Sequence, residues 1–191
     1  MFKHPFVFVL LFITYNNFFS QGYTPITHVN CNSIKNTSDC QSALTIIPLN
    51  KIEFKCSPEG YGNHLEIKNK GNKNLYFFEK EHNTIWLKFK TPLNALFTFK
   101  IIPIDSTYDF DFLLFNSDND ICDLQNIKTN IPERSNISRN SIKDKSITGL
   151  ELNSEKSFIH SGPGDVFSKE ISVTKDDEFY LVIDNVYGGK K

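Results

Sequence analysis

The sequence predicts an all-β fold, a jelly-roll-like antiparallel β-sandwich that follows an N-terminal signal peptide. Three observations indicate this fold: short apolar runs that alternate with polar residues, turn residues between those runs, and an apolar segment of leader length at the start of the chain. Short runs that are rich in Ile, Phe and Thr and bounded by turn residues are typical of β-strands rather than helices.

Three such runs occupy the centre of the chain, at His82–Lys90, Ala95–Ile104 and Asp109–Phe115. Apolar and polar residues alternate in them, so one face of each strand is expected in a core and the other toward solvent. The pattern predicts a meander of antiparallel strands. The expected core anchors are Trp86, Phe97, Phe99, Phe110 and Phe112. For Trp86, the single tryptophan, a ligand-stacking role is the alternative.

Further strands are expected on both sides of this centre, and no helix or internal repeat is predicted. Between them, Asn116–Ser146 is long and polar, which is typical of a functional, disordered or crosslinked loop. The other expected strands are Ala43–Leu49, Lys51–Cys56, His64–Lys68, Leu75–Phe78, Ser157–His160, Phe167–Val173 and Glu178–Ile183.

The first twenty residues have the pattern of a signal peptide. Lys3 and His4 give a basic start, and the apolar run Phe6–Ile13 is shorter than the ~20 residues that a membrane-spanning helix needs. Cleavage is expected after Ser20, although Phe18 departs from the small-residue rule and leaves the site open by a few residues. An uncleaved signal anchor is the alternative. Cleavage would leave about 170 residues, enough for one sandwich, with no transmembrane span in the mature chain.

Four cysteines follow the leader: Cys31, Cys40, Cys56 and Cys122. An even count in an exported chain favours disulfides. Four cysteines allow three pairings, and the expected one is Cys31–Cys40 with Cys56–Cys122. Zinc is the alternative, but the sequence lacks the closely spaced cysteine pairs that zinc sites use.

The net charge and the placement of the carboxylates limit which partners and cofactors are expected. The net charge is −1 with both signs interspersed, so a nucleic-acid partner is not expected. Asp109 and Asp111 share one face of a strand, and calcium prefers clustered oxygen ligands, so they are candidate calcium ligands. The alternative is a solvated strand face, and no other cofactor is expected.

Motifs for catalysis are weak in this sequence. It contains no GxSxG or HExxH pattern. Glu79 and Glu81 form a carboxylate pair of the kind that glycosidases use, but surface charge at a strand entrance is the more common explanation. The prediction is therefore that the chain is not an enzyme.

The central stretch Glu79–Asn116 resembles the core of bacterial pre-peptidase C-terminal (PPC)-like domains, which show N-x-x-W-Y-x-F, an alternating strand, and then D-Y-D-F-x-L-Y. The matching form occurs in exported proteins of Bacteroidetes, often ahead of an OmpA-like peptidoglycan-binding domain. The resemblance spans Gly60 to Lys191. Its later part is carried by Arg134–Arg139, Thr148–Leu150, Gly162–Lys169 and Glu178–Gly189.

This resemblance implies an exported jelly-roll module without catalysis of its own, and some relatives hold calcium near the strand aspartates that Asp109 and Asp111 match. It also implies one more strand after Gly189, so the chain is expected to be a fragment of a longer protein or a short paralogue. The expected layout is a signal peptide at 1–20, a polar arm and first strand at 21–50, and a PPC-like domain at 51–191.

The function expected from the sequence is that of a non-catalytic binding module of the cell envelope, placed in the periplasm, at the outer membrane or cell surface, or secreted. The expected partner is an envelope glycan or an envelope protein. Two alternatives remain: an accessory or degenerate domain of a secreted hydrolase, and a structural envelope protein.

Overall fold

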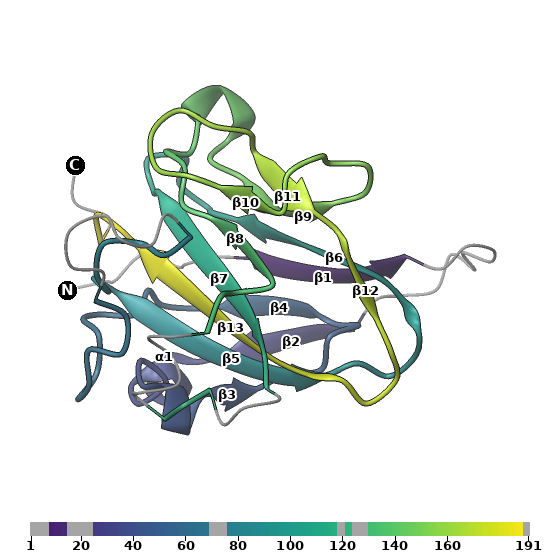
Figure 1. The fold of residues 1–191 in the computed structure, drawn as a ribbon. Helices are drawn as coiled ribbons and strands as arrows, with labels where there is room; N and C mark the ends of the chain where they lie inside the picture. The colour runs from purple at the N-terminus through teal and green to yellow at the C-terminus, as the bar shows by residue number, and fades with distance from the viewer. Residues whose placement is uncertain (1–7, 15–24, 69–75, 118–120, 124–129, 189–191) are drawn as a thin grey trace.

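A computed structural model describes residues 8–14, 25–68, 76–117, 121–123 and 130–188 of the chain. Two β-sheets pack face to face, so the fold is the all-β sandwich that the sequence predicts (Figure 1). In the view of Figure 1, β5, β13 and β7 lie side by side in front, and β1, β4 and β2 lie behind them. A membrane-crossing helix is not found in the described ranges, where the α-helix, α1 (Cys31–Ile34), has four residues.

The first sheet, sheet A, has the strand order β11-β9-β6-β1-β4-β2, with β12 also pairing with β6. Its strands are β1 (Phe8–Thr14), β2 (Ile26–Val29), β4 (Lys51–Phe54), β6 (Ala95–Ile102), β9 (Thr148–Glu151), β11 (Phe167–Lys169) and β12 (Ile171–Val173).

The second sheet, sheet B, has the order β10-β8-β7-β13-β5-β3. Four pairs in the two sheets, β2 with β4, β3 with β5, β8 with β10 and β9 with β11, are parallel, so the sandwich is not purely antiparallel. The strands of sheet B are β3 (Leu44–Thr45), β5 (Thr84–Lys90), β7 (Phe110–Asn116), β8 (Arg134–Asn136), β10 (Phe158–Ile159) and β13 (Glu178–Asn185).

The predicted central meander is wrong. β5 and β7 belong to sheet B, whereas β6 between them in the sequence belongs to sheet A. β13 separates β5 from β7, so that Val182 lies level with Trp86 on one side and with Leu113 on the other. Period-two alternation identifies a strand but says nothing of its neighbour, and here each connection crosses from one sheet to the other.

The main core lies between the two sheets. Phe97 and Phe99 from β6 and Phe110 and Phe112 from β7 are all buried in it. The rings of Phe99 and Phe112 meet edge to face with centroids 5.0 Å apart, and this contact joins the two sheets directly. Four of the five core anchors expected from the sequence thus lie in the space between the sheets, and Trp86 does not.

A second core covers the outer face of sheet B, which the alternation assigns to solvent. That assignment is wrong, because polar segments fold over this face and bury both sides of β7. Trp86 lies in this second core and stacks on Phe115 with ring centroids 6.3 Å apart. The members of this cluster are Cys40, Ile67, Phe77, Phe78, Trp86, Leu113, Phe115, Ile121, Ile137 and Val182.

The disulfides are Cys31–Cys56 and Cys40–Cys122, so disulfide bonding is confirmed but the expected pairing is wrong. The parallel register of β2 and β4 explains the first bridge, because it sets Val29 level with Phe54. Each cysteine follows its strand residue by two positions, which brings the two sulfurs together. The second bridge ties the N-terminal segment to the covering of sheet B.

The expected strands at His64–Lys68 and Leu75–Phe78 are absent from the described residues there, which hold an isolated bridge between Lys68 and Lys80. Leu75 lies outside the described residues. The polar arm instead gains order from β2, α1, β3 and a 3-10 turn at Cys40–Ser42, all held by the two disulfides.

Strand β1 lies inside the predicted signal peptide. It pairs antiparallel with β6 from Phe8 opposite Ile102 to Thr14 opposite Leu96. On its other edge it pairs antiparallel with β4 over three positions. The structure therefore describes residues 8–14 as an interior strand of sheet A.

Removing either disulfide is expected to destabilise the fold, and removing Cys40–Cys122 should cost more. The bridges close loops of 25 and 82 residues, for which loop entropy predicts losses of roughly 3.5 and 4.5 kcal/mol. Denaturant unfolding of Cys31→Ala/Cys56→Ala and Cys40→Ala/Cys122→Ala proteins measures both. Peptide mapping without reductant is the check on the pairing, and a Cys31–Cys40 peptide would contradict this structure.

Candidate functional site

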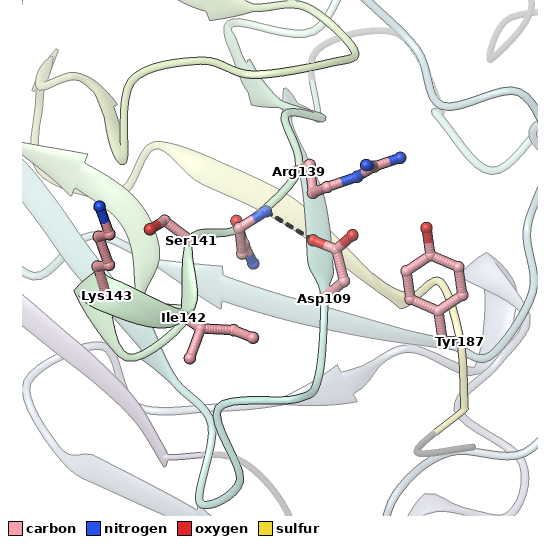
Figure 2. Close-up of a pocket in the computed structure, with 7 residues that line it drawn as sticks. Asp109, Arg139, Ser141, Ile142, Lys143 and Tyr187 are labelled. Carbon is pink, nitrogen blue, oxygen red and sulfur yellow. Dashed lines mark hydrogen bonds between the residues drawn. The ribbon is translucent and has the colours of Figure 1, made fainter. Parts of the chain in front are cut away.

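A cavity of about 580 Å³ opens where the start of β7, the loop after β8 and the end of β13 meet (Figure 2). The three segments are far apart in the sequence, and the fold brings them together. The residues lining the cavity, called the Asp109 pocket below, are Asp109, Arg139, Asn140, Ser141, Ile142, Lys143 and Tyr187.

Asp109 fixes both walls of this pocket. Its carboxylate Oδ1 accepts a hydrogen bond of 2.8 Å from the backbone N–H of Asn140 (Figure 2). Its backbone carbonyl accepts a hydrogen bond of 3.0 Å from the N–H of Val186, next to Tyr187. The Asn140 side chain also donates to the carbonyl of Phe110 at 3.1 Å. One residue therefore sets the distance between the wall that carries Arg139 and the wall that carries Tyr187.

The first wall is a loop held by hydrogen bonds within itself and to neighbouring segments. Ser146 donates from its backbone N–H to the carbonyl of Ser141 at 2.9 Å, and from its hydroxyl to the carbonyl of Ser106 at 2.6 Å. The backbone N–H of Arg139 donates to the carbonyl of Gly162 at 2.8 Å. The backbone is thus held, while the side chains of Arg139 and Lys143 remain exposed.

The second wall depends on Asp184 in β13, which is fully buried. Its carboxylate accepts hydrogen bonds from the backbone N–H groups of His82 and Asn83, both at 2.8 Å, and from His82 Nδ1 at 2.7 Å. The N–H of Asn185 in turn donates to the carbonyl of Asn83 at 3.0 Å. These bonds fix the end of β13, from which Tyr187 projects with 42% of its surface exposed.

The two candidate calcium ligands occupy different environments. Both are buried, but Asp109 lines the pocket, whereas Asp111 lies in β7 opposite Asp184 of β13. Desolvation, and then the charges of Asp184 and Asp109, raise the pKa of Asp111 well above its usual value. A raised pKa favours the neutral acid, which is a poor calcium ligand. In the described part of the chain, no three His, Cys, Asp or Glu residues form a metal-binding group.

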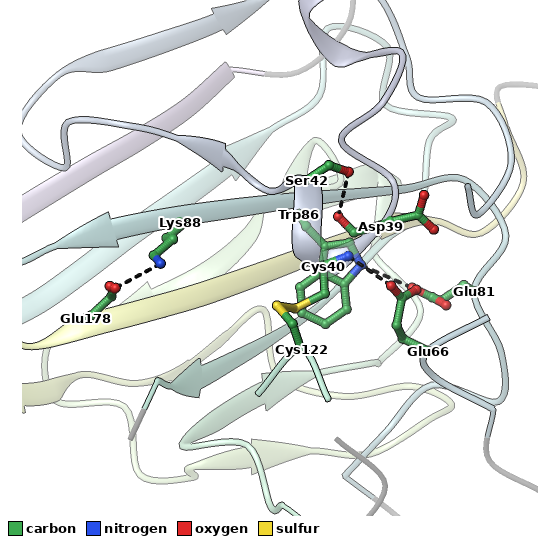
Figure 3. Close-up of a disulfide and its surroundings, with 9 residues drawn as sticks. All are labelled: Asp39, Cys40, Ser42, Glu66, Glu81, Trp86, Lys88, Cys122 and Glu178. Carbon is green, nitrogen blue, oxygen red and sulfur yellow. Dashed lines mark hydrogen bonds and ion pairs between the residues drawn. A yellow bond between two sulfur atoms is a disulfide. The ribbon is translucent and has the colours of Figure 1, made fainter. Parts of the chain in front are cut away.

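A second polar cluster lies beside the Cys40–Cys122 disulfide (Figure 3). Glu81 accepts hydrogen bonds from Trp86 Nε1 at 3.3 Å and from the N–H of Ile67 at 3.1 Å. Glu66 Oε1 accepts from the N–H of Cys40 at 2.9 Å, and its Oε2 is buried without a hydrogen-bond partner. The cluster links the segment that carries Glu66 and Ile67 to sheet B at the second core.

Burial raises the pKa of both Glu66 and Glu81. Desolvation, and then the charge of Glu66, raise the pKa of Glu81 to about 9. Desolvation also raises the pKa of Glu66. Two carboxyl groups in one dry site retain a proton at neutral pH, because both charges together are unfavourable. Glu79 and Glu81, which were weighed as a carboxylate pair and interpreted as surface charge, lie in different environments, since Glu79 is exposed and Glu81 is buried.

The sequence indicated only part of the pocket. Asp109 was a candidate from its strand position, but Arg139, Lys143 and Tyr187 were not. The segments that carry Arg139 and Tyr187, Arg134–Arg139 and Glu178–Gly189, contribute to the PPC-like resemblance, which was the one signal pointing to them, whereas Lys143 lies outside those segments. No protein-family model, curated protein or solved structure matches this chain, so that resemblance rests on the sequence pattern alone.

Substituting Glu81→Gln is expected to weaken the fall in stability that the parent protein shows between pH 4.5 and pH 8. The raised pKa means that the unfolded state loses this proton near pH 4.5 and the folded state near 9, so stability falls as pH rises between them. A glutamine cannot lose a proton, so the fall in stability from pH 4.5 to pH 8 should be smaller in the variant by roughly 2–4 kcal/mol. Its amide nitrogen cannot accept a hydrogen bond as the second carboxyl oxygen of Glu81 does, so the comparison is made between the two pH values within each protein. Urea unfolding at both pH values measures the two falls.

Glu79→Gln is the matched control, because Glu79 is exposed two positions away. The control should change stability by less than about 0.5 kcal/mol at either pH. A parent protein whose stability falls between the two pH values no more than that of Glu81→Gln would show that the carboxylate is ionised in the fold.

Thermal melting with calcium and with chelator tests the calcium prediction made from the sequence. An ion that binds the native state alone must stabilise it, by about 2.7 kcal/mol at 100 times its Kd. Because Asp111 is buried with a raised pKa, we expect the same melting midpoint in both solutions. A midpoint that rises with calcium, and no longer does so in Asp109→Asn, would establish the site.

Proposed function

We propose that this protein is an exported, non-catalytic binding module of the cell envelope, and that the Asp109 pocket binds an anionic glycan. The observation that carries the proposal is the composition of the pocket. Two cationic side chains and a half-exposed tyrosine surround an open cavity of about 580 Å³ whose backbone is held by hydrogen bonds.

The cations point to the charge of the ligand. Arg139 and Lys143 are exposed at the pocket, and neither has an ion-pair partner among the described residues. A guanidinium binds carboxylate or phosphate in a bidentate manner, and a lysine adds a second positive charge. A ligand that carries acidic groups would use both.

The neutral groups point to a sugar. Tyr187 offers an aromatic face beside its hydroxyl, and Asn140 and Ser141 carry an amide and a hydroxyl at the same cavity. Sugar rings present apolar C–H faces together with hydroxyl groups, so this mixture of stacking and hydrogen-bonding groups suits them. Peptidoglycan combines such rings with the carboxylates of its peptide stems.

The role of Asp109 supports binding rather than catalysis. It is the carboxylate among the pocket residues, and its Oδ1 accepts the Asn140 N–H that holds the loop in place. This bond assigns Asp109 to positioning the two walls. The two disulfides support export, because such bonds persist in oxidising compartments. The leader-like N-terminus and the PPC-like resemblance support it further.

Co-sedimentation with insoluble peptidoglycan sacculi and with chitin tests this function. Chitin is a neutral polymer of related linkage, so we expect sedimentation with sacculi and much less with chitin. Arg139→Ala and Tyr187→Ala should each reduce the fraction bound at least tenfold, because each removes a contact to the ligand. Raising the salt concentration should weaken binding by screening the charge on Arg139.

Lys175→Ala is the matched control for loss of a cation, because Lys175 is exposed at the opposite end of β13 from Tyr187. It should bind as the parent protein does, and Tyr187→Phe should separate stacking from the hydroxyl bond. Binding that is equal for the parent and for Arg139→Ala, or no binding to sacculi, would overturn the proposal.

A further inference from the structure

Strand β1 occupies an interior position in sheet A, between β4 and β6. It runs antiparallel to both neighbours, so β4 and β6 run parallel to each other and do not pair directly. The pairing with β6 covers all seven residues of β1, from Phe8 to Thr14. Sheet A is continuous across this position because β1 is in place.

The same seven residues lie within the predicted signal peptide, and cleavage after Ser20 would remove them. β4 and β6 would then stand two strand spacings apart, roughly 9.6 Å. The edge of β6 at residues 96–102 would lose its backbone partners, since its other edge already pairs with β9 and β12. Unpaired backbone groups beside a core are costly and attract another strand.

The walls of the resulting slot are held apart by separate contacts. β4 is tied to β2, and the Cys31–Cys56 bridge follows both strands. β6 is tied to β9 and β12, and Phe99 meets Phe112 of sheet B. Direct pairing of β4 with β6 would have to shift these contacts by one strand spacing. The slot is therefore expected to stay open until a strand fills it.

The floor of the slot is apolar. The residues of β4 and β6 that face the core and are buried there are Ile52, Phe54, Phe97, Phe99 and Ile101. Opening the slot would expose the edges of these side chains to water, and an incoming strand with apolar residues would cover them again.

We propose that, once its leader is removed, the exported protein carries a strand-acceptor slot between β4 and β6, which an extended apolar segment of a partner polypeptide fills. The segment Phe8–Thr14, with the sequence FVLLFIT, shows the chemistry that fits: seven uncharged residues, antiparallel to both walls. Adding a strand to a sheet in this way is a known mode of peptide recognition. The inference rests on the leader removal assumed in the proposed function, but not on glycan binding.

The test uses the processed protein purified from cells that export it, after its intact mass has located the N-terminus. The probe is a synthetic FVLLFIT peptide flanked by lysines for solubility. Its matched control carries proline at the position of Leu11, which removes a ladder N–H but keeps the apolar character. The readout is backbone hydrogen exchange, segment by segment.

The FVLLFIT peptide should slow exchange at least tenfold in residues 96–102 and in β4, and leave β5 and β13 unchanged. The proline peptide should bind at least tenfold more weakly. A processed protein in which the 96–102 amides on the edge away from β9 and β12 are already protected, or whose exchange the peptide does not change, would overturn the slot alone. A mass that retains residues 8–14 would overturn both the slot and leader removal. Loss of sacculus binding alone would leave the slot intact.

Discussion

β13 lies between β5 and β7, and the rest of sheet B depends on this double pairing. Along β13, residues 179–184 pair with both neighbours, so the backbone hydrogen bonds of the strand are used on its two edges. Its side chains serve two cores, since Leu181 faces the main core and Val182 the second. The end of the same strand carries Asp184 and leads into Tyr187, so the position of the pocket follows from this pairing.

Burial of both faces of sheet B explains why so many acids lie inside this protein. The polar segments that cover the outer face of sheet B bring buried backbone N–H groups, which need hydrogen-bond acceptors. Buried carboxylates supply those acceptors. Asp39, for example, accepts from the backbone N–H groups of Asn63 and His64, and Gly62 leaves room for its carboxylate where a Cβ would collide. Glu66, Glu81 and Asp184 do the same elsewhere. Glu81, which the sequence pattern assigned to surface charge, is one of these internal acceptors.

The alternation of apolar residues predicted strands well, because it depends on local geometry. β5, β6, β7 and β13 all lie within predicted runs or a few residues beyond them. Strand partners could not be predicted, since they depend on which sheet each connection enters. The disulfide pairing failed for the same reason: Cys31 meets Cys56 through the parallel register of β2 and β4, which no local pattern reveals. The pocket joins Asp109, Arg139 and Tyr187 from three distant segments, so it also lay beyond local inference.

The late position of β13 in the sequence has a consequence for how the chain folds. β5 pairs with a strand that lies 88 to 100 residues further along the chain, since Lys90 pairs with Glu178 and Thr84 with Asp184. Contacts of such long sequence separation make folding slow, since loop closure must precede the stabilising pairing. The centre of sheet B cannot form until residues 178–185 have left the ribosome. β5 and β7 therefore lack the strand that they share until β13 has been made.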